Sequence, residues 1–229
     1  MPRVVAFRTV GSTLDVAHAL AADDADSGTL IVADAQTAGR GRMGRTWRSE
    51  PGAGVWLTVI ERPSSSKALE VLSLRTGIAL APALDRLAGG RVRLKWPNDL
   101  YVGDDKLAGV LIEARWKDGA PEWVAIGVGI NVRVPESEPR AAGLRPGVAR
   151  LAVLDAAVPA IRAAACTSGL LSDEELEVYA DRDLAAGRVC VSPVAGRVAG
   201  IDSSGALRVE VGSEVTAVRG GSLVFAEEQ

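Results

Sequence analysis

Cationic side chains alternate with glycines in one stretch of the chain, Gly39-Arg40-Gly41-Arg42-Met43-Gly44-Arg45-Thr46-Trp47. Glycine lets the backbone adopt positive φ and approach a ligand closely, and guanidinium groups bind carboxylate and phosphate oxygens. A glycine-arginine repeat alone is also compatible with a solvated basic turn. Because Thr46-Trp47 and two apolar runs flank this one, we expect a loop that closes over an anionic ligand.

A second polar stretch, Lys95-Trp96-Pro97-Asn98-Asp99-Leu100, is followed by a lysine, Lys106, at the start of an apolar run. Neither stretch contains a Ser, Cys or His nucleophile. The single histidine, His18, excludes a histidine-based triad or a histidine-rich metal site and is expected to be an ordinary boundary residue of a helix. Cations, amides and one carboxylate predict chemistry on a phosphorylated small molecule, through positioning and charge neutralisation.

Together with Gly127-Val128-Gly129-Ile130-Asn131, these two stretches resemble the biotin protein ligases, the biotin–[acetyl-CoA-carboxylase] ligases, in the same order along most of the chain. The resemblance implies ATP-dependent activation of biotin as biotinyl-5'-AMP with release of pyrophosphate. Biotin then passes to a lysine of the biotin carboxyl carrier domain of a carboxylase. ATP and biotin would be substrates, and Mg²⁺ would assist.

The resemblance also implies site residues. Biotin would contact Ser12, Thr13, Gln36, Gly39, Arg40, Gly41, Arg42, Lys106, Gly109, Gly127 and Gly129. ATP or the adenylate would contact Arg40, Arg42, Arg45, Trp47, Lys95, Asn98 and Asn131. The catalytic residues would be Arg42, Lys106 and Asp99. Asp99 could hold Mg²⁺, with Asn131 as a second ligand, or help deprotonate the acceptor amine, and the sequence leaves both open. Leu14 and Met43 depart from the residues common in the family, so neither receives a role.

Each of these residues also has an ordinary structural interpretation. Ser12-Thr13-Leu14-Asp15 matches a capping box at a helix start, and Asp99 beside Pro97 is typical of a turn cap. Lysines are mostly exposed, and glycines inside strands weaken them unless another group approaches closely. The family resemblance favours the functional interpretation.

The elements around these motifs predict an α+β fold with a mixed or antiparallel sheet, like the class II aminoacyl-tRNA synthetase-like catalytic domain of biotin ligases. Expected strands cover residues 29–33, 55–60, 92–96, 107–114 and 124–130, with a tight turn at 102–105. Expected helices begin near Ser12 and cover 68–87, 151–171 and 173–184; Pro82 should kink or divide the first of these three.

From Arg188 onward the chain changes to short apolar runs separated by glycine turns. These runs, at 189–191, 194–201, 206–211, 215–218 and 223–226, predict a small barrel of about five strands. The family has an SH3-like domain at this end. We therefore expect a catalytic domain over residues 1–186 and an SH3-like domain over 187–229.

Composition limits the remaining choices. A net charge of −3 and a pI near 5.4 argue against a whole-chain nucleic-acid binder. Cys166 and Cys190 match no metal-ligand spacing and are expected to be small buried apolar residues. No apolar run is long enough for a membrane span or a leader, which favours the cytoplasm and no membrane partner. The Ser12-Thr13 motif begins almost at once, so we expect no operator-binding domain and no DNA partner.

Three other functions stay in competition. A lipoate or octanoate ligase or transferase of similar architecture is the nearest, followed by a sensor that binds biotin or its nucleotide ester without transferring it, and by a nucleic-acid-binding module. The acceptor protein and the oligomeric state, a homodimer included, are not determined by the sequence.

Overall fold

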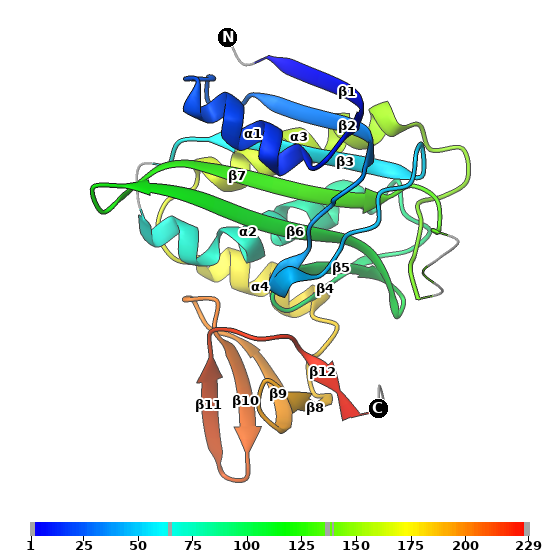
Figure 1. The fold of residues 1–229 in the computed structure, drawn as a ribbon. Coiled ribbons are helices and arrows are strands. Elements are labelled where there is room, and N and C mark those ends of the chain that lie inside the picture. The colour runs from blue at the N-terminus through cyan, green and yellow to red at the C-terminus, as the bar shows by residue number, and fades with distance from the viewer. Residues whose placement is uncertain (1–2, 64–65, 136–137, 139, 227–229) are drawn as a thin grey trace.

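The computed structural model describes residues 3–63, 66–135, 138 and 140–226, which form two β-sheets and four α-helices (Figure 1). The larger sheet has seven strands in the order β1-β2-β3-β7-β6-β5-β4. Its strands are β1 Val4–Val10, β2 Leu30–Gln36, β3 Gly54–Glu61, β4 Val92–Lys95, β5 Asp99–Val102, β6 Asp105–Lys117 and β7 Ala120–Asn131. Only the β1–β2 pair is parallel, so the sheet is mixed, as predicted.

Helices cover both faces of this sheet. Helix α1 (Thr13–Ala22) packs on one face, where Ile31 and Ile60 belong to its apolar cluster. Helices α2 (Ser66–Leu84) and α3 (Arg150–Cys166) pack on the other face, against the alternate side chains Val55, Leu57 and Val59 of β3 (Figure 1). Because β3 is covered on both faces, it is mostly apolar, with Thr58 and Glu61 as exceptions, and it is buried along its whole length.

Helix α4 (Asp173–Arg182) is attached to α2 through a buried arginine. Arg75 is 2% exposed and donates to both carboxylate oxygens of Glu175, at 2.6 and 3.0 Å. The same guanidinium donates to the carbonyl oxygens of Thr167, Gly169 and Leu170, in the segment between α3 and α4. Ser172 and Glu175 form a reciprocal capping box at the start of α4. One charged side chain therefore fixes the path between two helices.

The second sheet is antiparallel, with the order β11-β10-β9-β8-β12. Its strands are β8 Val189–Ser192, β9 Gly196–Ile201, β10 Leu207–Val211, β11 Glu214–Val218 and β12 Val224–Phe225. It shares one apolar core with the large sheet, and the Trp96 indole N–H donates to the Gly205 carbonyl at 2.9 Å across the junction. The five short strands predicted for this end are confirmed, consistent with a small SH3-like unit.

Several local predictions need correction. Strands β1 and β5 were not expected, since β1 is an edge strand with few buried side chains and β5 follows the turn at Pro97. Helix α2 is not divided at Pro82, and α3 ends at Cys166.

Two predictions about single side chains are also wrong. Ser12 caps α1 by accepting from the Leu14 N–H, but Asp15 does not complete a capping box because it pairs with Arg40. Cys166 is exposed, whereas Cys190 is buried as predicted. Among the described residues, no helix is both long and apolar enough to cross a membrane.

Candidate functional site

A cleft of about 460 Å³ lies on the α1 face of the large sheet, between the glycine-arginine loop, the start of α1 and residues 222–224 of the small sheet. It brings together most of the residues singled out from the sequence: Ser12, Thr13, Gln36, Arg40, Gly41, Arg42, Arg45, Trp47, Lys95, Asn98, Asp99, Lys106, Gly109, Gly127 and Gly129. Gly39 and Asn131 do not line it. Five segments, within residues 12–13, 36–47, 95–99, 106–109 and 127–129, thus form one site.

The glycine-arginine loop, residues 37–49 between β2 and β3, folds back on itself as a short hairpin. The Trp47 N–H donates to the Gly39 carbonyl at 2.9 Å, and the Gly41 N–H donates to the Arg45 carbonyl at 2.7 Å. Met43 sits at the tip with φ +56°, and its side chain is exposed. A Cβ on Gly39 would lie 2.4 Å from the Trp47 carbonyl oxygen, so this glycine is required by the hairpin itself.

Two neighbouring strand glycines form the floor beneath Trp47. Gly109 and Gly129 are paired across β6 and β7, and a Cβ on Gly129 would lie 2.5 Å from the Trp47 indole. The Trp47 ring also meets Trp56 edge-on, with the ring centroids 6.3 Å apart. The indole nitrogen is buried and has no hydrogen-bond partner among the residues that the structure describes. Because Gly109 and Gly129 have no side chains, the flat indole ring of Trp47 fits against the sheet at this point.

Lys106 and Asp99 form an ion pair inside the cleft. The Lys106 Nζ lies 2.7 Å from the Asp99 Oδ1 and 5.2 Å from the centroid of the Trp47 ring. The Asn131 amide donates to the Lys106 carbonyl at 3.2 Å from behind the strand, which holds the start of β6 in place. Asn131 is 4% exposed, so its contact with the site passes through the Lys106 backbone.

Arg42 and Arg45 reach from the loop toward the small sheet. Arg42 Nη1 donates to the Asn98 Oδ1 and to the Gly221 carbonyl, both at 3.3 Å, and Arg45 Nη2 donates to the Ser222 Oγ at 3.0 Å. Burial lowers the pKa of the Arg42 guanidinium, although Asp99 acts to raise it. These partners are neutral, so both guanidinium groups keep their charge available for an anion.

Lys95 is 8% exposed, contrary to the surface position that is usual for lysine. Its Nζ lies 4.5 Å from the centroid of the Phe225 ring and 5.5 Å from that of Tyr101. Asn98 is held next to it by exchanging two hydrogen bonds with the backbone of Val110, at 2.8 and 2.9 Å. A second ammonium is thereby kept on the cleft wall by aromatic faces.

Hydroxyl and amide groups close the other end of the cleft, at the start of α1. Gln36 Oε1 accepts from the backbone N–H and the hydroxyl of Thr13, at 2.9 and 3.1 Å, and the Thr58 hydroxyl donates to Thr13 at 2.9 Å. Leu14 packs against Gly127, where an added Cβ would lie 3.1 Å from the leucine side chain. This end combines fixed polar groups with an apolar wall.

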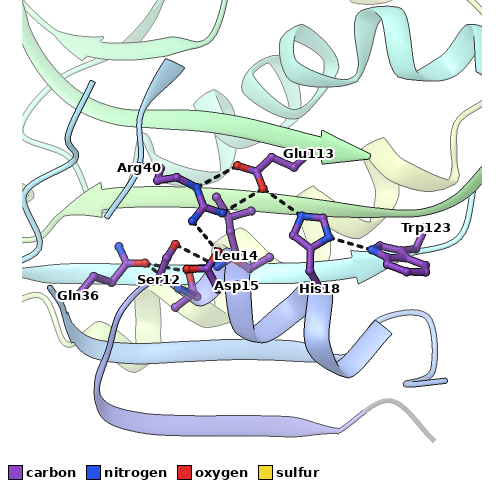
Figure 2. A network of polar contacts seen from close by, with 10 residues as sticks. Ser12, Leu14, Asp15, His18, Gln36, Arg40, Glu113 and Trp123 are labelled. Atoms are coloured by element: carbon purple, nitrogen blue, oxygen red, sulfur yellow. Dashed lines mark hydrogen bonds and ion pairs between the residues drawn. The ribbon is translucent and has the colours of Figure 1, made fainter. Parts of the chain in front are cut away.

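The Arg40 side chain points toward α1 and β6 (Figure 2). Its guanidinium donates to Asp15 at 2.6 Å and to both oxygens of Glu113 at 3.1 and 3.0 Å. Glu113 also contacts the His18 Nε2 at 3.0 Å, and His18 Nδ1 accepts from Trp123 at 2.9 Å. Hydrogen bonds to Glu113 raise the pKa of Arg40, although burial acts to lower it.

Sequence reasoning missed Asp15, His18, Glu113 and Trp123, as well as the wall formed by Ser222, Leu223 and Val224. Asp15 and His18 are three residues apart on α1, which is the only local signal that they share a face. The others come from distant segments and carry no motif. No group of three or more His, Cys, Asp or Glu side chains that could hold a metal occurs within the described part of the chain.

The mixed sheet and the small antiparallel sheet together have the fold of solved biotin protein ligases, and the family comparison agrees. Residues 7–131 match the model of the biotin/lipoate A/B protein ligase family. The chain belongs to this family. It is 34% identical to the biotin–[acetyl-CoA-carboxylase] ligase of Mycobacterium tuberculosis over 93% of this chain and 85% of that protein.

Other relatives match part of the chain or share its fold. The bifunctional ligase/repressor BirA of Bacillus subtilis is 42% identical over 54% of this chain, a match that spans 38% of the BirA length. A solved structure of biotin protein ligase from Aquifex aeolicus in complex with biotin and ATP superposes with a TM-score of 0.81, at 24% identity, and covers 97% of this chain and 98% of that one. The family and the fold predicted from the sequence are therefore confirmed.

Proposed function

We propose that this chain is an ATP-dependent biotin–protein ligase, which makes biotinyl-5'-AMP and transfers biotin to a lysine of a carboxylase's biotin carboxyl carrier domain. The observation that carries the proposal is the cleft itself. Arg42, Arg45, Lys95 and Lys106 converge on its polar end, while Thr13 and Gln36 close its other end. Such a site suits an elongated ligand with a polar head, an apolar body and a terminal carboxylate next to phosphates. The named relatives support biotin as that ligand.

In the first half-reaction, a carboxylate oxygen of biotin attacks the α-phosphorus of ATP, and the bond to pyrophosphate breaks. Two anions must meet, so the obstacle is charge repulsion and alignment. Lys106 would hold the biotin carboxylate, and Arg42 and Arg45 would neutralise the phosphate oxygens after exchanging their neutral partners for them. Trp47 would cover the adenylate and exclude water.

In the second half-reaction, an uncharged lysine amine of the acceptor attacks the acyl carbon of the adenylate. The bond to AMP breaks, an amide forms, and the amine loses a proton. Asp99 is a carboxylate of this part of the cleft, and its ion pair with Lys106 orients it. We assign it the role of accepting or relaying this proton.

Mg²⁺ fits this donor set only as an ion shared with substrate. The ion commonly uses one or two carboxylates and completes its shell with phosphate oxygens and water. Of the three carboxylates that line the cleft, Asp104 and Glu138 are exposed and Asp99 is paired with Lys106, and no preformed cage of acidic residues exists among the described residues. Asp99 would hold the ion, which would supply further neutralisation of the triphosphate.

We further propose that residues 1–186 form the catalytic domain and 187–229 a C-terminal domain that contributes residues 222–224 to the cleft wall. The substrates, ATP and a carboxylase subunit, favour the cytoplasm. No DNA partner is proposed.

The direct test mixes the purified chain with Mg²⁺, ATP, biotin and a biotin carboxyl carrier domain and measures the intact mass of the carrier. We expect one biotinyl group per carrier, and none when ATP is omitted or when the acceptor lysine is replaced by arginine. A carrier of unchanged mass together with tight biotin binding would instead support the non-transferring sensor.

Lipoate activation is the second candidate, because the family model covers both biotin and lipoate ligases. Pyrophosphate release measured with each acid separates the two. We expect release with biotin and little above background with lipoate. Faster release with lipoate would reverse the assignment.

A further inference from the structure

Arg40 differs from the other arginines of the loop in the charge of its partners. Its guanidinium makes three charged hydrogen bonds, two to Glu113 and one to Asp15. The hydrogen bonds of Arg42 and Arg45 go to neutral groups: an amide oxygen and a backbone carbonyl for Arg42, and a hydroxyl for Arg45. Two carboxylates already neutralise Arg40, so a phosphate would have to displace both before this side chain could bind it.

The carboxylate that holds Arg40 is itself oriented from the opposite side (Figure 2). An indole N–H can only donate, so the bond from Trp123 requires His18 Nδ1 to be the acceptor. The proton of His18 then lies on Nε2, which donates to Glu113 Oε2 at 3.0 Å. Donation therefore runs from Trp123 through His18 to Glu113, and the Glu113 carboxylate accepts from Arg40 on its other side.

Arg40, the last residue of this hydrogen-bond network, belongs to the first half of the glycine-arginine loop. Arg40 is flanked by Gly39, whose carbonyl accepts from the Trp47 N–H, and by Gly41, whose N–H donates to Arg45. Gly39 also lies close to the Gln36 side chain that organises the Thr13 end of the cleft. Holding Arg40 consequently fixes the position of this half of the loop relative to the start of α1, without holding the tip at Met43.

We propose that Glu113 and His18 are positioning residues for biotin, acting through Arg40, and that Arg40 is an anchor of the loop and not a ligand of the nucleotide phosphates. This inference rests on the proposed function for its substrate. It divides the loop into an anchored half at the biotin end and a half, from Arg42 onward, that can rearrange around ATP.

The test is a double-mutant cycle with Arg40→Met, Glu113→Gln and the double variant, measured by pyrophosphate release with biotin and with ATP varied in turn. An anchor predicts that each single change raises KM for biotin about tenfold, in line with the loss of charged hydrogen bonds, and that the double variant is no worse than either single one. KM for ATP should change less than about twofold.

Phosphate binding by Arg40 would give a different result in the same measurements. If Arg40 binds phosphate, Arg40→Met raises KM for ATP, and Glu113→Gln leaves biotin affinity unchanged because it only releases the arginine. Either observation overturns the proposal.

His18→Phe, which removes both ring hydrogen bonds, should raise KM for biotin about threefold, a smaller effect because the carboxylate stays next to Arg40. Glu70→Gln, which removes an exposed carboxylate paired with Arg219, is the matched control and should change neither KM.

A second readout needs no ligand. Trypsin should cut the loop of the free Glu113→Gln protein about fivefold faster than that of the parent, since an unanchored loop opens more often. An unchanged cutting rate overturns the anchor. If the parent instead shows no biotin-dependent pyrophosphate release, the proposed function fails, and the proteolysis result still decides whether Arg40 anchors the loop.

Discussion

Two arginines of this protein make nearly the same contacts and serve different purposes. Arg75 and Arg40 each bind both oxygens of a glutamate, but Arg75 is 2% exposed and also donates to three backbone carbonyls. Arg40 is 35% exposed and has a second carboxylate, from an exposed aspartate, in place of the carbonyls. Solvent can reach the Arg40 guanidinium, whereas the guanidinium of Arg75 is buried and depends on its protein partners.

The difference follows from what each arginine must hold. Arg75 joins α2 to α4 and to the segment that connects α3 with α4. Under the proposed function, Arg40 holds a loop that opens for substrates and closes again. Partial exposure keeps the free energy of that contact small enough to be reversible. The same chemistry thus stabilises the fold in one place and controls a movable segment in the other.

The largest effect is expected for Arg75→Ala. It removes a buried guanidinium and leaves the partly buried Glu175 and three carbonyl groups without their donor, so the free energy of unfolding should fall by about 3–5 kcal/mol. Urea unfolding measures it, with Arg40→Ala as the matched control, for which we expect a loss below about 1 kcal/mol. Equal losses for the two variants would show that Arg75 and Arg40 contribute alike to the stability of the fold.

The next effect concerns activity. Lys106→Gln should lower the rate of adenylate formation by about 100- to 1,000-fold, the usual effect of removing one preorganised charge at a reacting centre. Its side chain is 31% exposed, so the free energy of unfolding should change little. Single-turnover pyrophosphate release and a urea curve on the same preparation check both parts. A matching fall in stability and rate would mean that the ion pair with Asp99 is structural.

Asp183 is a buried carboxylate that, unlike Glu175, is not paired with a buried arginine in the described part of the chain. Burial raises its pKa from 3.8 to about 6, and its Oδ2 has no hydrogen-bond partner among the described residues. The folded state therefore binds more protons than the unfolded state between about pH 4 and pH 6, and stability falls as the pH rises through that window. Asp183→Asn should increase the free energy of unfolding by about 1–3 kcal/mol at pH 7.5 and by much less at pH 4.5. A gain independent of pH would contradict this assignment.

The smallest expected effect is that of Arg42→Ala. Its neutral partners make little contribution to folding, so the variant should unfold like the parent and release biotinyl-AMP about tenfold faster, because one charged contact to the adenylate is lost. Chromatographic measurement of free biotinyl-AMP over time tests this. Unchanged release together with unchanged biotin affinity would show that Arg42 does not retain the intermediate.

Prediction from the sequence worked where the signal was local. The apolar run of β3 and the Ser172 cap of α4 lie at the predicted places because side-chain pattern and capping act over a few residues. It failed for Cys166, which lies at the exposed end of α3, and for β1, whose pairing with β2 depends on a partner about 26 residues away. Local pattern does not encode which face of an element will be covered.

For the candidate site, the sequence by itself determined the inventory: a loop of glycines and arginines, two lysines, an aspartate and strand glycines that together identify the family. Tertiary structure alone decided how these groups are divided. It buried Lys95 against Phe225, turned Arg40 toward Glu113 and His18, and brought Gly221 and Ser222 to Arg42 and Arg45. The physical reason is that polar partners are chosen by distance in space: Glu113, Gly221 and Ser222 lie between 73 and 179 residues along the chain from the arginines they contact.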